Sequence, residues 1–425
     1  MQRLDRAPGM TTSVEELYAQ RQRRLADAMA GRVPDRVPAP LFTADFFARY
    51  AGCTLAEVVY DADKLERALE KTILDFEPDA FEQQHTRNLL GPQLDLIGYL
   101  PMEWPGSRVG EDDPFQYLDR EIMRADEYRE FIADPSYFWL TRMIPRTAQH
   151  LAAFAGFPNP LGLVYTGMAL NIAPFGTPEM KRAMDILHEA GQRALETLAR
   201  DRAFIQHMAG LGFPVHRGGA MLCPFDLIVD FMRGAKGGML DMMRRPDELL
   251  EAIDVVLDNF NRRAIELFRT LPNRTVFIPL HWGIDGFMSP KQFGIFYWPQ
   301  LRRLIQMTLD AGLTPMPFFE GDCTSRLEVI ADVPPGSCTY QFEQTDLLRA
   351  KAVFGTRICI RGGMPASLLI AGSPTEVEER VRQLVATVGR DGAYILDGGG
   401  AGIPREARPA NVKAMFDAIR RHGVY

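Results

Sequence analysis

The chain lacks any long hydrophobic run, and this absence excludes a helix that crosses a membrane. No stretch approaches the roughly 18 consecutive apolar residues that a bilayer span requires. The first eight residues carry charges and therefore also lack the apolar segment of a secretory signal. With 425 residues, of which 46% are hydrophobic, the sequence can still bury a large core. We therefore expect a soluble protein.

Cysteine and positive charge are also limited. The five cysteines are dispersed and form no Cys-x-x-Cys pair, which favours a reducing compartment over a disulfide framework. We therefore expect a cytoplasmic location. The formal net charge is -7 and no dense run of Lys and Arg occurs, which argues against nucleic acid or an anionic membrane as the main partner. A small molecule is the expected partner.

What the chain has instead is a regular alternation in its C-terminal part. Short apolar runs at 314–320, 338–343, 357–361 and 393–397 alternate with segments of helical periodicity. The runs are rich in β-branched or aromatic residues, as expected for strands buried on both faces. Polar or glycine-rich residues follow the runs, and parallel α/β folds place their sites at the carboxyl ends of strands. The alternation predicts the closing half of a β/α barrel.

Earlier apolar runs complete the predicted barrel. We assign four further strands to 37–43, 79–85, 160–166 and 275–281. The predicted fold class is α/β, a single-domain (β/α)8 TIM-type barrel. Its predicted parts are an N-terminal helical extension (1–36), the barrel (37–425) and a helical insertion at about 176–270.

A group of polar side chains is expected at one part of the barrel rim. Glu320 and Cys323 lie at and just past one strand end, Glu343 ends the next strand, and His281 ends the one before. This set could hold zinc or another divalent ion with an open coordination position. Crowded carboxylates could instead form a metal-free acid/base cluster, or pair with arginines and only brace the barrel. The sequence leaves these three alternatives open.

Further rim positions are candidate substrate contacts. They combine polar groups with an aromatic wall that would suit a planar or methoxylated molecule. These candidates are Asp45, His85, Tyr165, Trp282, Phe318 and Gly399. The glycine-rich run after Asp397 could cradle an anion through backbone N–H groups. It lacks the strand-to-helix setting of a Gly-x-Gly-x-x-Gly dinucleotide motif, so NAD is not expected.

Several motifs, in this order and spacing, resemble the uroporphyrinogen decarboxylase superfamily over nearly the whole chain. They are Asp285-Gly-Phe-Met-Ser289-Pro290, Asp346-Leu-Leu-Arg-Ala-Lys351, Gly362-Gly-Met-Pro365, Gly402-Ile-Pro404 and Asn411-Val-Lys-Ala-Met415. The resemblance implies a (β/α)8 barrel, commonly dimeric, with its site in the cleft at the strand carboxyl ends. We therefore expect a homodimer.

The superfamily contains two chemistries, and this chain departs from the motifs of both. Uroporphyrinogen decarboxylases carry an arginine-rich motif in the first barrel loop, which Thr43-Ala-Asp-Phe-Phe-Ala-Arg49 does not match. A tetrapyrrole with eight carboxylates requires several fixed cations. The corrinoid-dependent methyltransferases bind zinc through a His-x-Cys and a later Cys. The matching positions here are Phe318, Glu320 and Ala401, of which only the glutamate could bind a metal.

The resemblance and the rim residues together lead to one expected function and two alternatives. The expected enzyme moves a methyl group between a small methylated compound and a corrinoid or corrinoid protein. His281, Glu320 and Glu343 would bind a metal or activate the leaving heteroatom, and Asp285 and Asp397 would orient them. The alternatives are a decarboxylase acting on a carboxylated pyrrole or aromatic, with a carboxylate or His as proton donor, and a non-catalytic barrel that only binds a ligand.

Overall fold

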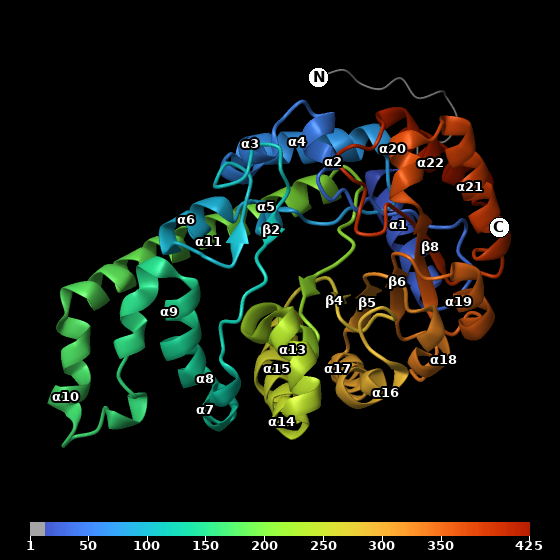
Figure 1. The fold of residues 1–425 in the computed structure, drawn as a ribbon. Coiled ribbons are helices and arrows are strands. Elements are labelled where there is room, and N and C mark those ends of the chain that lie inside the picture. The colour runs from blue at the N-terminus through green and yellow to red at the C-terminus, as the bar shows by residue number, and fades with distance from the viewer. Residues whose placement is uncertain (1–12) are drawn as a thin grey trace.

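The computed structural model describes residues 13–425, which form a parallel β/α barrel joined to a long helical arm (Figure 1). The main sheet runs in the order β3-β4-β5-β6-β7-β8, and every neighbouring pair is parallel. Its strands are β3 (Gly219–Ala220), β4 (Thr275–Leu280), β5 (Thr314–Phe319), β6 (Thr339–Phe342), β7 (Cys359–Met364) and β8 (Tyr394–Gly398). The expected absence of a signal segment concerns residues that lie outside the described part of the chain, as does the start of the predicted helical extension.

Two short extended segments close this sheet into the predicted barrel. The N–H of Leu396 in β8 donates to Pro38 O at 2.9 Å, and Leu41 bridges Phe81 in parallel. Phe81 in turn bridges Val215 in parallel, just before β3. The predicted strands 37–43 and 79–85 therefore occupy the first two barrel positions, although only Leu41 and Phe81 of these segments make ladder bridges.

The predicted third strand is wrong. Residues 160–162 form a 3₁₀ turn on the arm, and Tyr165 is 94% exposed. The third barrel position is taken by the chain from Pro214 to Met221, within the segment interpreted as a helical insertion. The residues of that segment, which include His, Arg and glycines, are typical of a loop, so it was not predicted as a strand. The 160–166 run was predicted as a strand because it is apolar, but its side chains are not buried.

The arm is a helical projection with its own small core. It contains α6 (Gly91–Ile97), α7 (Tyr128–Ala133), α8 (Pro135–Phe138), α9 (Ile144–Thr147), α10 (Met168–Ile172) and α11 (Pro178–Ala209), and a two-stranded ribbon, β1 (Met102–Glu103) with β2 (Gln116–Tyr117). Leu151, Phe154 and Met180 are buried together between α9 and α11, whereas Tyr128 and Phe131 of α7 join the main core. Helix α11 has 32 residues, so it is about 48 Å long. It runs from the far end of the arm, beside α10, back to the barrel (Figure 1).

The remaining helices surround the barrel. Helix α1 (Val14–Met29) packs Leu25 and Ala28 against Ala80, Cys359 and Ile395. The others are α2 (Phe46–Tyr50), α3 (Leu55–Tyr60), α4 (Ala62–Phe76), α5 (His85–Asn88), α12 (Pro224–Ile228), α13 (Gly234–Arg244), α14 (Pro246–Val256), α15 (Arg262–Phe268), α16 (Pro290–Gln292), α17 (Trp298–Asp310), α18 (Leu327–Ile330), α19 (Leu347–Phe354), α20 (Ala366–Ala371), α21 (Pro374–Thr387) and α22 (Pro409–His422). None of the helices in residues 13–425 is long and apolar enough to cross a bilayer.

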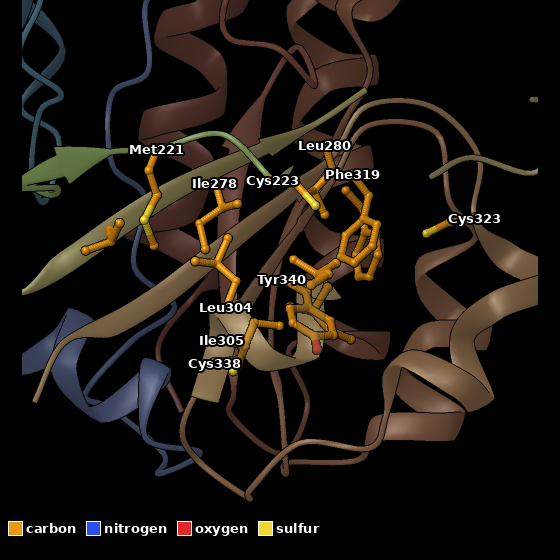
Figure 2. Close-up of a cluster of buried hydrophobic side chains, with 14 of the residues drawn as sticks. Met221, Cys223, Ile278, Leu280, Leu304, Ile305, Phe319, Cys323, Cys338 and Tyr340 are labelled. Atoms are coloured by element: carbon orange, nitrogen blue, oxygen red, sulfur yellow. The ribbon is translucent and has the colours of Figure 1, made fainter. Parts of the chain in front are cut away.

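The main core lies between the sheet and these outer helices. Strand residues that point outward pack in this core: Ile278 of β4 lies beside Leu304 of α17, and Leu280 lies near Cys223 and Phe319 (Figure 2). Because side chains alternate along a strand, the intervening residues of β4 point into the barrel, toward the mouth. The core therefore fixes the strands whose ends carry the candidate site.

Candidate functional site

Three of the predicted residues meet at one edge of the barrel mouth. His281 follows β4, Glu320 follows β5 and Glu343 follows β6, and the parallel register aligns the ends of these strands. Nε2 of His281 lies 3.7 Å from Oε1 of Glu320, and the charge of Glu343 acts on Glu320. The side chains of His281 and Glu320 are 32% and 36% exposed, so a solute can reach both.

Asp230 holds the His281 imidazole on the side away from Glu320. Its Oδ2 accepts a hydrogen bond from Nδ1 of His281 at 2.6 Å, and its Oδ1 accepts one from Nε1 of Trp282 at 2.6 Å. Because two donors fix this carboxylate, the imidazole keeps one orientation and directs Nε2 toward Glu320. We call these three residues, Asp230, His281 and Glu320, the acid–base array.

The array makes His281 a proton donor at neutral pH. Burial alone would lower the pKa of His281, but the hydrogen bond to Asp230 and the charges of Asp226, Asp230 and Glu320 raise it to about 9. Burial raises the pKa of Glu320, opposed by the charge of His281. A protonated imidazole with an accessible Nε2–H can give its proton to a leaving group or a carbanion.

Asp226 fixes the backbone that carries His281. It lies on α12, and its carboxylate accepts hydrogen bonds from the backbone N–H groups of His281 at 3.2 Å and Trp282 at 3.3 Å. The hydroxyl of Tyr297 donates to the same carboxylate at 2.8 Å. Asp226 is fully buried, and burial raises its pKa to about 7. The three donors hold the end of β4 in place.

Asp226 and Asp230 were not predicted, because their segment was interpreted as part of an insertion. The available signal was the spacing of two carboxylates four residues apart, seven residues after the glycine pair that ends at Gly219. On a helix, that spacing puts both side chains on one face. Had the third barrel strand been recognised, this helix would have been expected at the rim.

The mouth carries more carboxylates than cations. The largely buried carboxylate of Asp230, the partly exposed Glu320 and the exposed Glu343 stand beside the imidazolium of His281. Arg87 lies nearby on α5 but pairs with Asp45 at 3.6 Å. A site with this balance attracts cationic molecules, admits neutral ones and repels polyanions.

Below the mouth, a buried ion network spans the barrel interior. Arg361 donates from Nε to Asp397 at 2.6 Å and from Nη2 to Glu82 at 2.7 Å. Arg217 pairs with Glu82 at 3.0 Å and stacks on the ring of Phe277. Burial raises the pKa of Asp397 to about 6, although Arg361 opposes the shift. Two guanidinium groups and two carboxylates neutralise one another here, so Asp397 braces the barrel rather than orienting His281.

The wall of the barrel interior is aromatic, as predicted from Phe318. Its ring stacks on Phe277 with centroids 5.8 Å apart, and Phe318 is 1% exposed. Nearer the rim, Trp282 packs against Phe287 at 4.5 Å. Trp282 thus both borders the mouth and holds Asp230, whereas Phe318 is a core residue below it.

Asp285 and Cys323 do not face the array, contrary to the sequence-based roles. Oδ1 of Asp285 accepts from Nε of Arg326 at 2.7 Å and from Oγ of Ser325 at 2.8 Å, so it ties two loops together. Cys323 is buried, its sulfur lies 3.1 Å from Oγ1 of Thr345, and it points toward the apolar cluster around Phe319 (Figure 2). Burial raises the pKa of Cys323 to about 12. It is a core thiol.

His85 and Tyr165 also lie away from the mouth. His85 is fully buried between Glu66, at 3.3 Å from Nε2, and Asp201, at 3.1 Å from Nδ1. The chain leaves the second barrel position after Gln84 and begins α5, so His85 faces α11 instead of the barrel interior. Tyr165 belongs to the arm because its segment is not a barrel strand.

The glycine loop after β8 lies beside the end of β6. Gly399 has φ +82° and an added Cβ would lie 2.1 Å from Gly402 O, so only glycine fits this turn. Nε2 of Gln341 donates to Gly400 O at 3.1 Å, which pins the loop over β6. Gly400 in turn packs against Glu343. The loop therefore lies beside Glu343 at the mouth. A substrate contact at Gly399 stays a prediction.

The donor set does not fit the predicted metal centre. Over residues 13–425, no group of three or more His, Cys, Asp or Glu side chains could hold a metal ion. His281 and Glu320 are near each other, but Cys323 points into the core, so the four predicted ligands do not converge on one point.

Comparisons with known proteins give the family and the fold. The family model described as uroporphyrinogen decarboxylase (URO-D) matches residues 175–422. A uroporphyrinogen decarboxylase from Psychromonas ingrahamii is 29% identical over 142 residues, 32% of this chain. One from Syntrophotalea carbinolica is 28% identical over 141 residues, 33% of this chain. The matches span only 38% and 39% of those relatives' lengths.

A solved structure matches over almost the full length. The methyltransferase from Methanosarcina mazei superposes with a TM-score of 0.62, covering 97% of this chain and 99% of its own. The two sequences are 13% identical, so this likeness establishes the shared fold.

Proposed function

This chain belongs to the uroporphyrinogen decarboxylase (URO-D) family, and we propose that it is a methyl-transferring enzyme of that family. The proposed reaction moves a methyl group from a small methylated compound to a corrinoid. The observation that carries the proposal is the acid–base array, which holds a protonated His281 with Nε2 at the barrel mouth.

In the proposed reaction, His281 acts as the general acid. A bound corrinoid would supply a reduced cobalt as the methyl acceptor; the bond between the methyl carbon and its heteroatom would break, and its electrons would stay on the heteroatom. The proton on Nε2 of His281 then moves to that heteroatom, so a neutral leaving group departs. Asp230 stabilises the imidazolium before transfer, and Glu320 is placed to relay a proton from solvent back to Nε2.

The charge of the mouth supports a neutral or cationic methyl donor. Asp230, Glu320 and Glu343 together outweigh the positive charge of His281, and the arginines below are neutralised by Glu82 and Asp397. A tetrapyrrole with many carboxylates would meet repulsion here without unpaired cations to bind it. A small donor with an aromatic or apolar body would instead rest on Trp282.

The methyl acceptor is expected to stay outside the barrel. A corrinoid is too large to enter the barrel interior, whose wall of Phe318 and Phe277 is closely packed. We therefore expect it to approach the mouth from outside, either free or on a partner protein.

Spectroscopy of cobalamin provides the test. The purified protein is mixed with cob(I)alamin and a panel of methoxylated aromatics and methylated amines, and methylcobalamin formation is followed by absorbance. We expect turnover with at least one donor and a 10²- to 10⁴-fold lower rate in His281→Gln. His188→Gln, on the exposed face of α11, is the control and should match the wild type. Absence of methylcobalamin with every donor would reject the proposal.

Decarboxylation is the second candidate because the matched family and both curated relatives carry that name. In that reaction the carbon–carbon bond to a carboxylate breaks, carbon dioxide leaves, and His281 protonates the carbanion that remains. Release of carbon dioxide from uroporphyrinogen, dependent on His281, would favour it over methyl transfer. The acidic mouth leads us to expect no release.

A further inference from the structure

The short ribbon of β1 and β2 carries one aromatic residue that the rest of the protein leaves open to solvent. Tyr117 lies on β2 and is 75% exposed. The ribbon itself is fixed, because Trp104, directly after β1, is buried and donates from Nε1 to the hydroxyl of Tyr60 at 2.9 Å. The N–H of Leu118 donates to Pro101 O at 2.8 Å, which holds β2 beside β1. Tyr117 is therefore an exposed ring on an anchored support.

The ribbon lies beside the rim of the barrel mouth. Figure 1 shows β2 next to α5, where the arm joins the barrel. Helix α5 carries Arg87, which donates from Nη1 to Ala44 O at 3.1 Å and pairs with Asp45 at 3.6 Å. Ala44 and Asp45 directly follow the first barrel segment, 37–43, so Arg87 lies at the rim. The charge of Arg87 also acts on the hydroxyl of Tyr117.

Two residues of the acid–base array act on the same hydroxyl. The protein that surrounds this hydroxyl raises the pKa of Tyr117. The charge of Arg87 opposes the shift, and the charges of Glu320 and Asp230 add to it. Since solvent screens exposed charges that lie more than about 10 Å apart, the hydroxyl lies near all three groups, which belong to three separate elements. A side chain that water reaches and protein still surrounds stands in a concave part of the surface.

An aromatic side chain in this place can hold the body of a substrate. The Tyr117 ring offers an apolar face, and its hydroxyl makes no hydrogen bond to any other residue in 13–425. Because its pKa is raised, the phenol stays neutral at pH 7 and adds no charge to the mouth. On the barrel side, Trp282 has its indole N–H engaged by Asp230 at 2.6 Å, so it offers only its ring. The two rings belong to different parts of the chain, the arm and the barrel.

We propose that Tyr117 is a specificity-determining residue of the mouth, whose ring forms a wall for the planar or apolar body of a small substrate. The inference rests on the proposed use of the mouth as the substrate site, and it applies to methyl transfer and to decarboxylation alike. It gives the ribbon a role, because the arm then completes a site that the barrel strands alone leave open.

Ligand-observed NMR titration tests the proposal on the full chain, without a corrinoid and without turnover. The probes are anisole and benzyl methyl ether, which are uncharged and carry an aromatic ring. We expect Tyr117→Ala to raise the dissociation constant roughly 3- to 10-fold and Tyr117→Phe, which keeps the ring, to change it by less than about twofold. The matched control is Tyr165→Ala, which removes a 94% exposed ring from the arm and should bind as the wild type does. Circular dichroism checks that each variant is folded.

The proposal is overturned if Tyr117→Ala binds both probes as tightly as the wild type, or if Tyr117→Phe loses as much affinity as Tyr117→Ala. A wild type that binds neither probe overturns it as well. Failure of the proposed reaction is read separately, because absent methylcobalamin formation with an intact difference in affinity rejects methyl transfer and keeps the role of Tyr117. Where a probe is turned over, Tyr117→Ala should raise KM by the same factor and leave kcat unchanged, since a wall binds ground state and transition state alike.

Discussion

Nδ1 of His281 and Oδ2 of Asp230 lie 2.6 Å apart, and this hydrogen bond sets the protonation state of the candidate site. The Asp230 carboxylate stabilises the charged imidazole and so contributes to the raised pKa of His281, about 9. Trp282 holds the other oxygen of the same carboxylate at 2.6 Å, which prevents it from turning away.

Removing the charge of Asp230 should lower the pKa of His281. We expect Asp230→Asn to shift it from about 9 toward the ordinary value near 6.5, because burial, which lowers it, is then opposed by fewer charges. Titration of the His281 ring by NMR measures the shift. Asp258→Asn, which removes an exposed pair with Arg262, should leave it unchanged.

The same raised pKa predicts how stability depends on pH. His281 binds its proton more tightly in the folded than in the unfolded state, so its stabilising contribution is complete below about pH 6.5. It is lost as pH rises through about 9. Urea denaturation at several pH values should therefore show a steeper decline for the wild type than for His281→Gln across this window. Parallel curves would contradict the assignment.

Arg361 should be essential for stability rather than for chemistry. It is fully buried and bonds both Glu82 and Asp397, which are also buried. Arg361→Met removes the positive charge that bonds both buried carboxylates. We therefore expect a loss of roughly 3–5 kcal/mol in the free energy of unfolding. Arg382→Met breaks an exposed pair with Glu379 and should cost less than about 1 kcal/mol. Urea titration separates the two.

Cys323 should be neither a ligand nor a nucleophile. Burial raises the pKa of its thiol to about 12, and Thr345 is its hydrogen-bonding partner. We expect iodoacetamide to label the half-buried Cys53 before Cys323 in the folded protein, as read by peptide mass spectrometry. Cys323→Ser should keep its methyl-transfer rate. Rapid labelling of Cys323 would place it in solvent.

The later strands could be predicted from sequence because burial on both faces makes them apolar. The runs at 275–281 and 314–320 differ from β4 and β5 by a single residue at one end. The third barrel position was hidden for the opposite reason. The third strand position carries His216 and Arg217, which lie next to Glu82 in the barrel interior. In the sequence, such polar residues are typical of a surface loop.

The candidate site could be predicted only in part, because only some of its residues follow strands that are apolar enough to recognise. His281, Glu320 and Glu343 follow apolar strands and could be aligned by counting strand ends. Asp226 and Asp230 come from a helix whose preceding strand was not recognised, so two carboxylates that hold His281 were missed. Asp285 was placed at the site because it follows β4, but its partner Arg326 turns it outward.

Asp226 provides the last prediction, because its buried carboxylate has a pKa near neutrality. Burial raises this pKa from 3.8 to about 7, so its favourable contribution is complete below pH 3.8 and is lost as pH rises through 7. Asp226→Asn removes the charge but keeps a carbonyl acceptor for the His281 N–H. We therefore expect the stability of this variant, relative to the wild type, to increase between about pH 4 and 7 and to level off above. Asp254→Asn, on the exposed pair with Arg303, should show no such trend.

Tyr297→Phe removes a donor to Asp226 and should cost roughly 1 kcal/mol, more at high pH, since the charged carboxylate then loses a hydrogen bond.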